Sequence, residues 1–332
     1  MSGPVRMRPV DRRAGNRRLR RIGDIMTERT ALIGIDWGTT AFRAYRIDAA
    51  GVVRDRLESE LGIRAVAPGG FEAVLSEQIG DWIDADGPCP VLMAGMVGSR
   101  QGWHETPYCP LPAGLADIAG ALITVAEVRS CPVAIVPGVV RADGGMPDVM
   151  RGEETQIFGA LEETGRSGGR LVLPGTHSKW ATAEDGGIRH FATYMTGEIF
   201  GALCDHTILG SLMSERDRFH AGGFERGLDD GHASGGPGAL LHRVFGARTR
   251  GLFGETEAEA LADYLSGILI GAEFADAAGD TGGDIAIIGA SGLAERYRIA
   301  AERFGFRAEC VDPACTARGL FAIAARGGLI HS

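Results

Sequence analysis

Residues 31–43 read Ala-Leu-Ile-Gly-Ile-Asp-Trp-Gly-Thr-Thr-Ala-Phe-Arg, an apolar run that ends in an Asp-x-Gly-Thr-Thr turn. Residues 171–179 read Leu-Val-Leu-Pro-Gly-Thr-His-Ser-Lys and show the same change from an apolar run to a Gly-Thr turn. A buried strand that ends in such a turn presents hydroxyls and free backbone N–H groups at one place, which suits phosphate oxygens. The repeated turn therefore predicts a nucleotide held between two related halves of the chain.

The second turn also contains Lys179, which is the only lysine in the sequence. A chain that uses arginine at every other basic position has kept one compact ammonium group here. Two interpretations stay open, a phosphate or substrate contact and an ordinary surface cation.

Size and composition favour a two-domain α/β protein. The chain has 332 residues, of which 45% are hydrophobic and 51 are glycines, as is typical of many tight strand–helix junctions. The six cysteines form no C-x-x-C pair, which favours free thiols in a reducing cytoplasm. No apolar run is long enough to cross a bilayer, so we expect no membrane partner.

The N-terminal segment has its own charge. Residues 1–28 hold eight arginines against three acidic residues, although the whole chain has a net charge of −9. We expect this segment to be a disordered or mis-started extension, with Met26 as a natural start, and a nucleic-acid arm is the alternative. The acidic remainder argues against nucleic acid as the main partner.

The hydrophobic pattern predicts the same order of elements twice, three antiparallel strands followed by alternating helices and strands. In the first half we expect strands at 31–35, 42–47, 52–59, 90–94 and 132–136, and helices at 70–84 and 153–163. In the second half we expect strands at 170–173, 179–183, 188–194, 284–288 and 307–311, and helices at 197–212, 256–278, 293–304 and 316–325. The domains would span 29–165 and 168–330, each a mixed sheet flanked by helices, with a Gly- and Arg-rich insertion at about 214–255 near the cleft.

The first turn carries groups suited to a metal-bound phosphate. A carboxylate such as Asp36 would be repelled by phosphate, so we expect it to act through Mg²⁺ and water. Gly38 allows close approach, and Arg43 could bind the same oxygens bidentately. The alternative is an ordinary hairpin turn with a surface arginine, but the second Gly-Thr turn favours phosphate binding.

A third turn of small residues follows the strand at 284–288. Small side chains let a purine and ribose lie on the backbone, and the next helix would offer N-terminal N–H groups. Such turns are common in α/β folds. This turn supports a nucleotide site only because it follows the two Gly-Thr turns in the expected order. The expected nucleotide contacts are Asp36, Gly38, Thr39, Thr40, Arg43, Gly175, Thr176, Ser178, Lys179, Gly289, Ala290, Ser291 and Gly292.

Two further segments carry candidate catalytic and substrate groups. Glu153 and Glu154 begin a helix, where a carboxylate could accept a hydroxyl proton, although acidic residues are common there for dipole reasons. The polar loop 95–108 follows a buried strand, and its alternative role is an ordered surface loop. In that loop we expect hydroxyl binding, carboxylate binding and sugar stacking from Ser99, Gln101, Arg100 and Trp103.

These motifs resemble those of the actin-like ATPase superfamily, to which sugar kinases belong. Ile33–Arg43, Gly175–Lys179 and Ile288–Gly292 are similar, in order, to its two phosphate motifs and its adenosine motif. Gly152-Glu153-Glu154-x-Gln is similar to the Gly-Asp-Gln helix start of FGGY-type carbohydrate kinases, whose carboxylate serves as base. Glu153 replaces that aspartate and Glu154 adjoins it, so either could be the base.

More narrowly, the chain resembles 2-dehydro-3-deoxygalactonokinases from about residue 30 to the C-terminus. The resemblance rests on Gly95–Tyr108, Pro137–Val139, Asp148–Gln156 and Leu173–Trp180. It implies two ribonuclease H-like domains with a nucleotide cleft between them, sugar and phosphate binding in the first, and phosphate and adenosine binding in the second.

The same resemblance implies ATP- and Mg²⁺-dependent phosphorylation of the 6-hydroxyl of 2-dehydro-3-deoxy-D-galactonate, in galactonate catabolism. The alternatives are a kinase for another keto-deoxy sugar acid and a non-catalytic, ATP-dependent sugar-sensing switch of the same fold. A homodimer is left open.

Overall fold

The structure is a computed structural model that describes residues 29–214, 218–233, 238–278 and 282–330. The expected extension at 1–28 and two short parts of the expected insertion lie outside the described residues. Within the described part, no helix is long and apolar enough to span a membrane.

The first sheet has six strands in the order β3-β2-β1-β4-β8-β7. The first three strands form the expected antiparallel meander, β4 and β8 run parallel to β1, and β7 closes one edge antiparallel. The bounds are β1 Thr30–Trp37, β2 Phe42–Asp48, β3 Val53–Ser59, β4 Val91–Ala94, β7 Ile123–Val128 and β8 Cys131–Ile135.

The second sheet repeats this arrangement in the order β15-β14-β11-β12-β13-β6. Its meander β11-β12-β13 is antiparallel, and β14 and β15 continue parallel to β11. The short β6 comes from the first half and pairs with β13, which ties the halves together. The bounds are β6 Ala113–Gly114, β11 Gly169–Leu173, β12 Ser178–Glu184, β13 Gly187–Tyr194, β14 Gly283–Ile288 and β15 Phe306–Val311.

The predicted duplication of two mixed sheets flanked by helices is therefore confirmed. In both halves the Gly-Thr turn joins the first two strands of the meander. A third, small sheet was not predicted; it comprises β5 (Tyr108–Pro110), β9 (Gly138–Arg141) and β10 (Asp148–Met150). Its strands are too short to show a periodic pattern.

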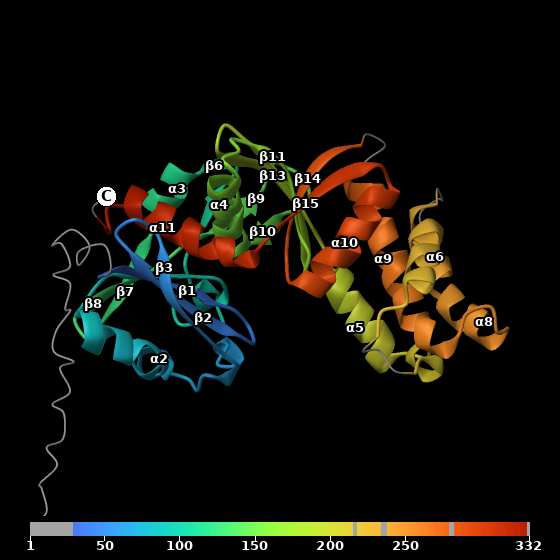
Figure 1. The fold of residues 1–332 in the computed structure, drawn as a ribbon, viewed down its shortest axis with the longest axis horizontal. Helices are drawn as coiled ribbons and strands as arrows, with labels where there is room; N and C mark the ends of the chain where they lie inside the picture. The colour runs from blue at the N-terminus through green and yellow to red at the C-terminus, as the bar shows by residue number, and fades with distance from the viewer. Residues whose placement is uncertain (1–28, 215–217, 234–237, 279–281, 331–332) are drawn as a thin grey trace, which may run out of the picture.

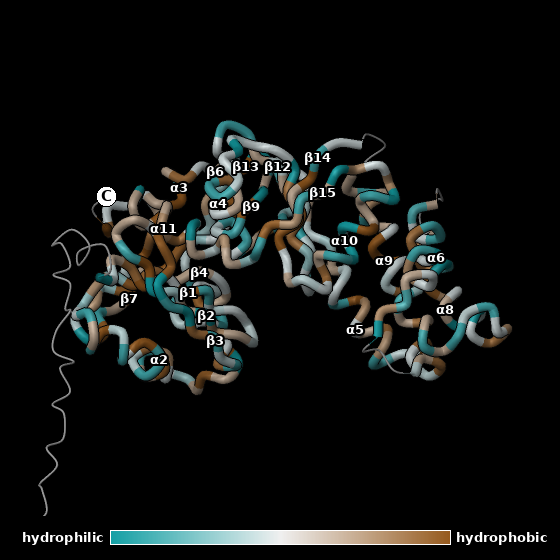
Figure 2. The backbone as a smooth tube through the Cα atoms, in the orientation of Figure 1, coloured by the Kyte–Doolittle hydropathy of each residue, from teal (hydrophilic) through white to brown (hydrophobic). Residues whose placement is uncertain are grey.

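The last helix crosses back to the first half. α11 (Thr316–Arg326) packs beside α4 (Glu153–Thr164) and against β1, as Figure 1 shows. Our expected second domain, 168–330, included this helix, whereas the structure places it on the first sheet. Hydrophobic residues are concentrated in α11 and in the strands on which it packs (Figure 2). Leu320 and Ile323 of this helix are fully buried.

The opposite face of the first sheet is covered by α2 (Phe71–Asp86), and α3 (Leu115–Gly120) packs against α11. The second sheet is followed by α5 (Thr196–His206), α9 (Leu261–Ala277) and α10 (Ser291–Arg303). α5 is shorter than predicted because a separate 3-10 turn occupies the end of its predicted range. α9 is shorter than predicted because another 3-10 turn lies near the start of its range. The 3-10 turns lie at Ile63–Ala65, Met96–Gly98, Gly210–Leu212, Ala258–Ala260 and Pro313–Cys315.

The described residues of the expected insertion form three helices, α6 (Ala221–His232), α7 (Ala239–Val244) and α8 (Gly246–Leu252). α6 packs closely on α9, and glycines on both helices allow this approach. A Cβ added at Gly227 would lie 2.1 Å from Tyr264 O, and one added at Gly267 would lie 2.2 Å from Phe224 O. The buried face of α6 alternates large apolar residues with glycines, Phe224 and Leu228 with Gly227 and Gly231, and the glycines weaken the hydrophobic pattern of the segment.

The same kind of glycine contact joins α4 to α11. A Cβ added at Gly159 would lie 2.0 Å from Cys315 O, and one added at Gly319 would lie 2.0 Å from Thr155 O. Backbone therefore touches backbone where the two helices cross, and a methyl group fits at neither position.

We expect Gly319→Ala to lower the free energy of unfolding by about 1–3 kcal/mol, because the two helices must separate to admit the methyl group. Urea unfolding measures this change. Gly201→Ala on α5 is the matched control, since a Cβ there meets nothing within 4 Å and alanine favours a helix. Equal stability of Gly319→Ala and the wild type would contradict the close crossing.

Candidate active site

The three turns predicted to bind a nucleotide meet at one cavity of about 760 Å³. Asp36 and Arg43 line it from the first turn, Pro174–Thr176 from the second, and Ile288–Ala290 from the third. Asp312–Ala314, which precede α11, complete one side. The residues that flank the first Gly-Thr turn therefore face the same space as the second turn, although the two turns belong to different sheets.

Asp36 lies at the carboxyl end of β1 and keeps 16% of its side-chain exposure. Burial raises the pKa of Asp36, and the Arg43 guanidinium, 3.3 Å away, opposes that shift. Arg43 also donates from Nε to Glu58 Oε1 at 2.8 Å. The carboxylate is thus only partly compensated within the protein, and this oxygen donor beside a phosphate-sized space fits a hydrated Mg²⁺.

The backbone of the first turn is fixed by the segment after β3. Gly38 N–H donates to Ala41 O at 2.9 Å, and Gly38 O accepts from Ile63 N–H at 3.0 Å. Thr39 is partly buried and Thr40 is exposed, and neither is among the residues that line the cavity.

The second turn rests on a buried carboxylate that the sequence analysis missed. Glu273 of α9 is 3% exposed and accepts hydrogen bonds from Ser178 Oγ, Trp180 Nε1 and the Tyr297 hydroxyl, each at 2.7 Å, and from Thr196. The Ser178 hydroxyl is therefore committed to Glu273 and does not face the cavity. An acidic residue inside the apolar run of α9 was the available sequence signal.

The third turn contributes Gly289 and Ala290 to the cavity, whereas Ser291 and Gly292 begin α10 and lie exposed. A smaller pocket of about 150 Å³ adjoins it, because Gly175 lines both spaces. Its other walls include Thr196 of α5, Ser266 of α9 and Leu293 of α10.

The two adjacent glutamates of α4 have different environments. Glu153 keeps 25% of its side-chain exposure and lies 3.0 Å from Lys179 Nζ, while its Oε2 accepts from Arg151 N–H at 3.0 Å. Glu154 is fully buried and accepts from Gly152 N–H at 2.7 Å and from the Thr155 hydroxyl at 3.0 Å. Only Glu153 has solvent access, so the geometry favours Glu153 as a proton acceptor.

The polar loop 95–108 places its four candidate residues in different surroundings. Ser99 is buried and donates to Met96 O at 2.7 Å, and Trp103 stacks on Phe71 with centroids 6.2 Å apart. Arg100 and Gln101 are exposed, with Arg100 Nε 3.5 Å from Glu105 Oε1. Ser99 and Trp103 therefore shape the loop, and Arg100 and Gln101 remain accessible.

Arg151 fixes this loop to the start of α4 and was not singled out from the sequence. Its Nη2 donates to Thr106 O at 2.9 Å, a second N–H group donates to the Thr106 hydroxyl, and the guanidinium lies 4.3 Å from the Tyr108 ring centroid. The loop 95–108 and the start of α4, where Glu153 lies, are therefore joined through the buried Arg151.

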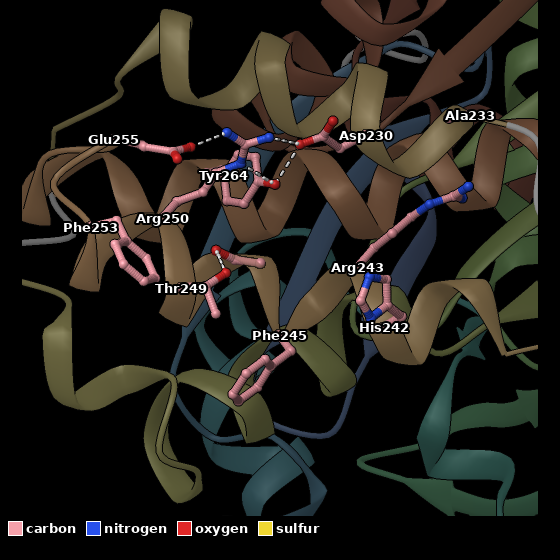
Figure 3. A pocket seen from close by; sticks show the side chains of 11 residues that line it. Asp230, Ala233, His242, Arg243, Phe245, Thr249, Arg250, Phe253, Glu255 and Tyr264 are labelled. Carbon is pink, nitrogen blue, oxygen red and sulfur yellow. Dashed lines mark hydrogen bonds and ion pairs between the residues drawn. The ribbon is translucent and has the colours of Figure 1, made fainter.

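A separate hollow of about 510 Å³ lies among α6, α7, α8 and α9, and Figure 3 shows its side chains. Arg250 donates there to Tyr264, Glu255 and Asp230 at 2.9, 2.7 and 3.0 Å. The hydrogen-bond donors of Arg250 are therefore used within the protein. None of the three turns lines this hollow, so the candidate site is the larger cavity, which residues of both large sheets line.

The duplicated sheets and the cavity that both of them line define a two-domain fold with related halves, and the relatives of this chain place it among the kinases. The chain belongs to the family described as 2-keto-3-deoxy-galactonokinase, whose sequence model matches residues 36–323. It is 35% identical over 303 residues to a probable 2-dehydro-3-deoxygalactonokinase of Rhizobium meliloti (strain 1021), covering 91% of this chain and 98% of that protein.

Two further relatives agree with this family. The 2-dehydro-3-deoxygalactonokinase of Escherichia coli (strain K12) is 35% identical over 279 residues, covering 82% of this chain and 90% of that protein. The crystal structure of a Sinorhizobium meliloti protein provisionally named 2-dehydro-3-deoxygalactonokinase superposes with a TM-score of 0.82 at 36% identity, covering 89% of this chain and 98% of that one.

The buried Glu154 generates a pH prediction. Burial raises its pKa from 4.5 to about 8, so between these values only the unfolded chain loses this proton. This contribution to stability is full below pH 4.5 and is lost as the pH rises toward 8. The glutamine of Glu154→Gln cannot ionise. We therefore expect the free energy of unfolding of this variant, relative to that of the wild type, to increase when the pH is raised from 5 to 8.5.

Urea unfolding at the two pH values measures that difference. Glu162→Gln, on an exposed position of the same helix, is the matched control for removing one negative charge. A Glu154→Gln variant whose stability relative to the wild type is the same at both pH values would contradict the assignment of a buried, protonated carboxyl.

Proposed function

We propose that this kinase transfers the γ-phosphoryl group of ATP to the 6-hydroxyl of 2-dehydro-3-deoxy-D-galactonate. The observation that carries the proposal is the cavity lined by Asp36 and Arg43, which flank the first Gly-Thr turn, and by Gly175 and Thr176 of the second, with Glu153 of α4 near enough to Asp36 to raise its pKa. Phosphoryl transfer to an alcohol needs those parts together, a phosphate site and a carboxylate that accepts the hydroxyl proton. The names of the relatives supply the sugar acid.

The phosphates would lie on the turn backbones, with Thr39, Thr40 and Arg43 on one side and Gly175 and Thr176 on the other. Preorganised N–H groups and a guanidinium stabilise the charge that spreads over the transferring phosphoryl group. Gly38 and Gly175 keep the backbone accessible, because no side chain stands between it and the ligand.

Asp36 is the residue that would hold Mg²⁺, through water. Its partly compensated carboxylate supplies the oxygen chemistry that this ion prefers, and Mg²⁺ would neutralise phosphate charge when bound. The adenosine would extend from Gly289 and Ala290, with Ser291 and Gly292 at the helix start, toward the pocket of about 150 Å³ that Gly175 also lines.

The sugar acid would lie against the loop 95–108. Arg100 and Gln101 are accessible to its carboxylate and hydroxyls, and Ser99 and Trp103 hold the loop in shape. Arg151 would keep that loop at a constant distance from Glu153, since it bonds the loop and directly precedes the first turn of α4.

An ADP-release assay over a panel of keto-deoxy sugar acids tests the function. We expect the highest kcat/KM with 2-dehydro-3-deoxy-D-galactonate. Preference for another epimer would reassign the substrate, and ATP binding without turnover of any sugar acid would favour a switch protein and overturn the proposal.

Glu153→Gln tests the base. We expect kcat to fall by about 10²–10⁴-fold while the dissociation constant for ATP is retained, because the amide cannot accept the proton. Stopped assays and isothermal titration measure the two quantities. A comparable loss in Glu154→Gln alone would move the base by one position.

Arg100→Ala tests the carboxylate contact. We expect the KM for the sugar acid to rise about tenfold or more, with ATP affinity unchanged, since a charge-assisted hydrogen bond is lost. Arg307→Ala, an arginine equally exposed on β15, is the control. An unchanged KM would place the substrate carboxylate elsewhere.

A further inference from the structure

Lys179 is a buried cation with little freedom of movement. Its side chain is 4% exposed, and its backbone lies in β12, paired with Leu173 of β11 and Thr193 of β13. Its Nζ lies 3.0 Å from Glu153 Oε1 and donates to His177 O at 3.2 Å. The residues that line the large cavity include Gly175 and Thr176 from this turn, but not Lys179.

Glu153 is consequently held at both carboxylate oxygens. Oε1 pairs with Lys179 from the second sheet, and Oε2 accepts the Arg151 N–H from the start of its own helix at 3.0 Å. Two donors from two different elements fix the rotation of a carboxylate and the direction of its remaining lone pairs. A general base needs that orientation to meet a hydroxyl proton.

The other charged groups near Glu153 are mostly acidic. Asp36 of β1, with its partner Arg43, and Glu154 of α4 are both close enough for Glu153 to raise their pKa values. Glu154 has no cation paired with it among the described residues, and burial raises its pKa to about 8. Lys179 is the feature that distinguishes Glu153 from this neighbour.

Building on the proposed function, we propose that Lys179 is a positioning residue that acts on the reaction through Glu153 and does not bind phosphate. In the transfer step, the 6-hydroxyl oxygen forms its bond to the γ-phosphorus as the bond to the bridging oxygen breaks. That electron pair leaves with ADP, and the hydroxyl proton passes to Glu153. The ammonium group holds the waiting carboxylate in its orientation through the 3.0 Å contact with Oε1.

A double-mutant cycle tests the proposal. We expect Lys179→Met to lower kcat about 100-fold and Lys179→Arg to restore part of it, with the ATP dissociation constant unchanged in both. In a Glu153→Gln background, Lys179→Met should add no further loss, because the group it acts on is already gone. This double variant also removes both charges, so it leaves no unpaired carboxylate to impair folding. Arg189→Met, on the neighbouring β13, controls for the loss of one cation.

The pH profile provides a second readout. Because removal of a neighbouring cation makes a carboxylate bind its proton more tightly, the acid limb of kcat/KM should move to higher pH in Lys179→Met. A rise in the ATP dissociation constant, multiplicative losses in the double variant or an unmoved acid limb would each overturn the proposal.

A measurement without substrate separates this proposal from the proposed function. In nucleotide-free protein labelled with ¹³C-carboxyl glutamate, the resonance that Glu153→Gln removes should titrate at a higher pH in Lys179→Met than in the wild type. If the wild type phosphorylates no sugar acid, the proposed function fails, and this titration still decides whether Lys179 controls Glu153. An unshifted resonance would overturn the ion-pair assignment.

Discussion

The contact between Gly159 and Gly319 is the constraint on which the site depends. It brings α4 and α11 together at backbone distance, so neither helix can shift without losing the other. α11 is in turn seated on the first sheet, where a Cβ on Gly34 of β1 would lie 3.0 Å from Leu320 Cδ1. Because Glu153 begins α4 and Asp36 lies one residue before the end of β1, this packing sets how closely the candidate base approaches the first Gly-Thr turn.

In the second half, buried polar contacts hold Lys179 and the second turn in place. Lys179 extends from β12 to Glu153, and Glu273 gathers donors from β12, α5 and α10 beneath the second turn. A buried carboxylate is costly unless its lone pairs are satisfied, and Glu273 has four neutral donors. These hydrogen bonds fix the position of the second Gly-Thr turn relative to the smaller pocket, which Thr196 and Tyr297 line.

Local sequence patterns predicted the duplicated sheets and the convergence of the three turns, because strand periodicity and Gly-Thr breaks are local features. The sheet on which α11 packs could not be predicted in this way, because the pattern of an amphipathic helix does not specify which sheet the helix covers. Ser178 and Trp103 show a similar limit. The sequence predicted ligand contacts for the Ser178 hydroxyl and the Trp103 indole, but these side chains contact Glu273 and Phe71, which are distant in the sequence.

The charge of the cavity explains why its turns are built from glycine and threonine. Its lining carries three carboxylates, Asp36, Glu58 and Asp312, against the two guanidinium groups of Arg43 and Arg56. Such a surface has no excess positive charge to attract a triphosphate. If the cavity binds a triphosphate as proposed, backbone N–H groups of the turns and the cation proposed at Asp36 would supply the compensating positive charge.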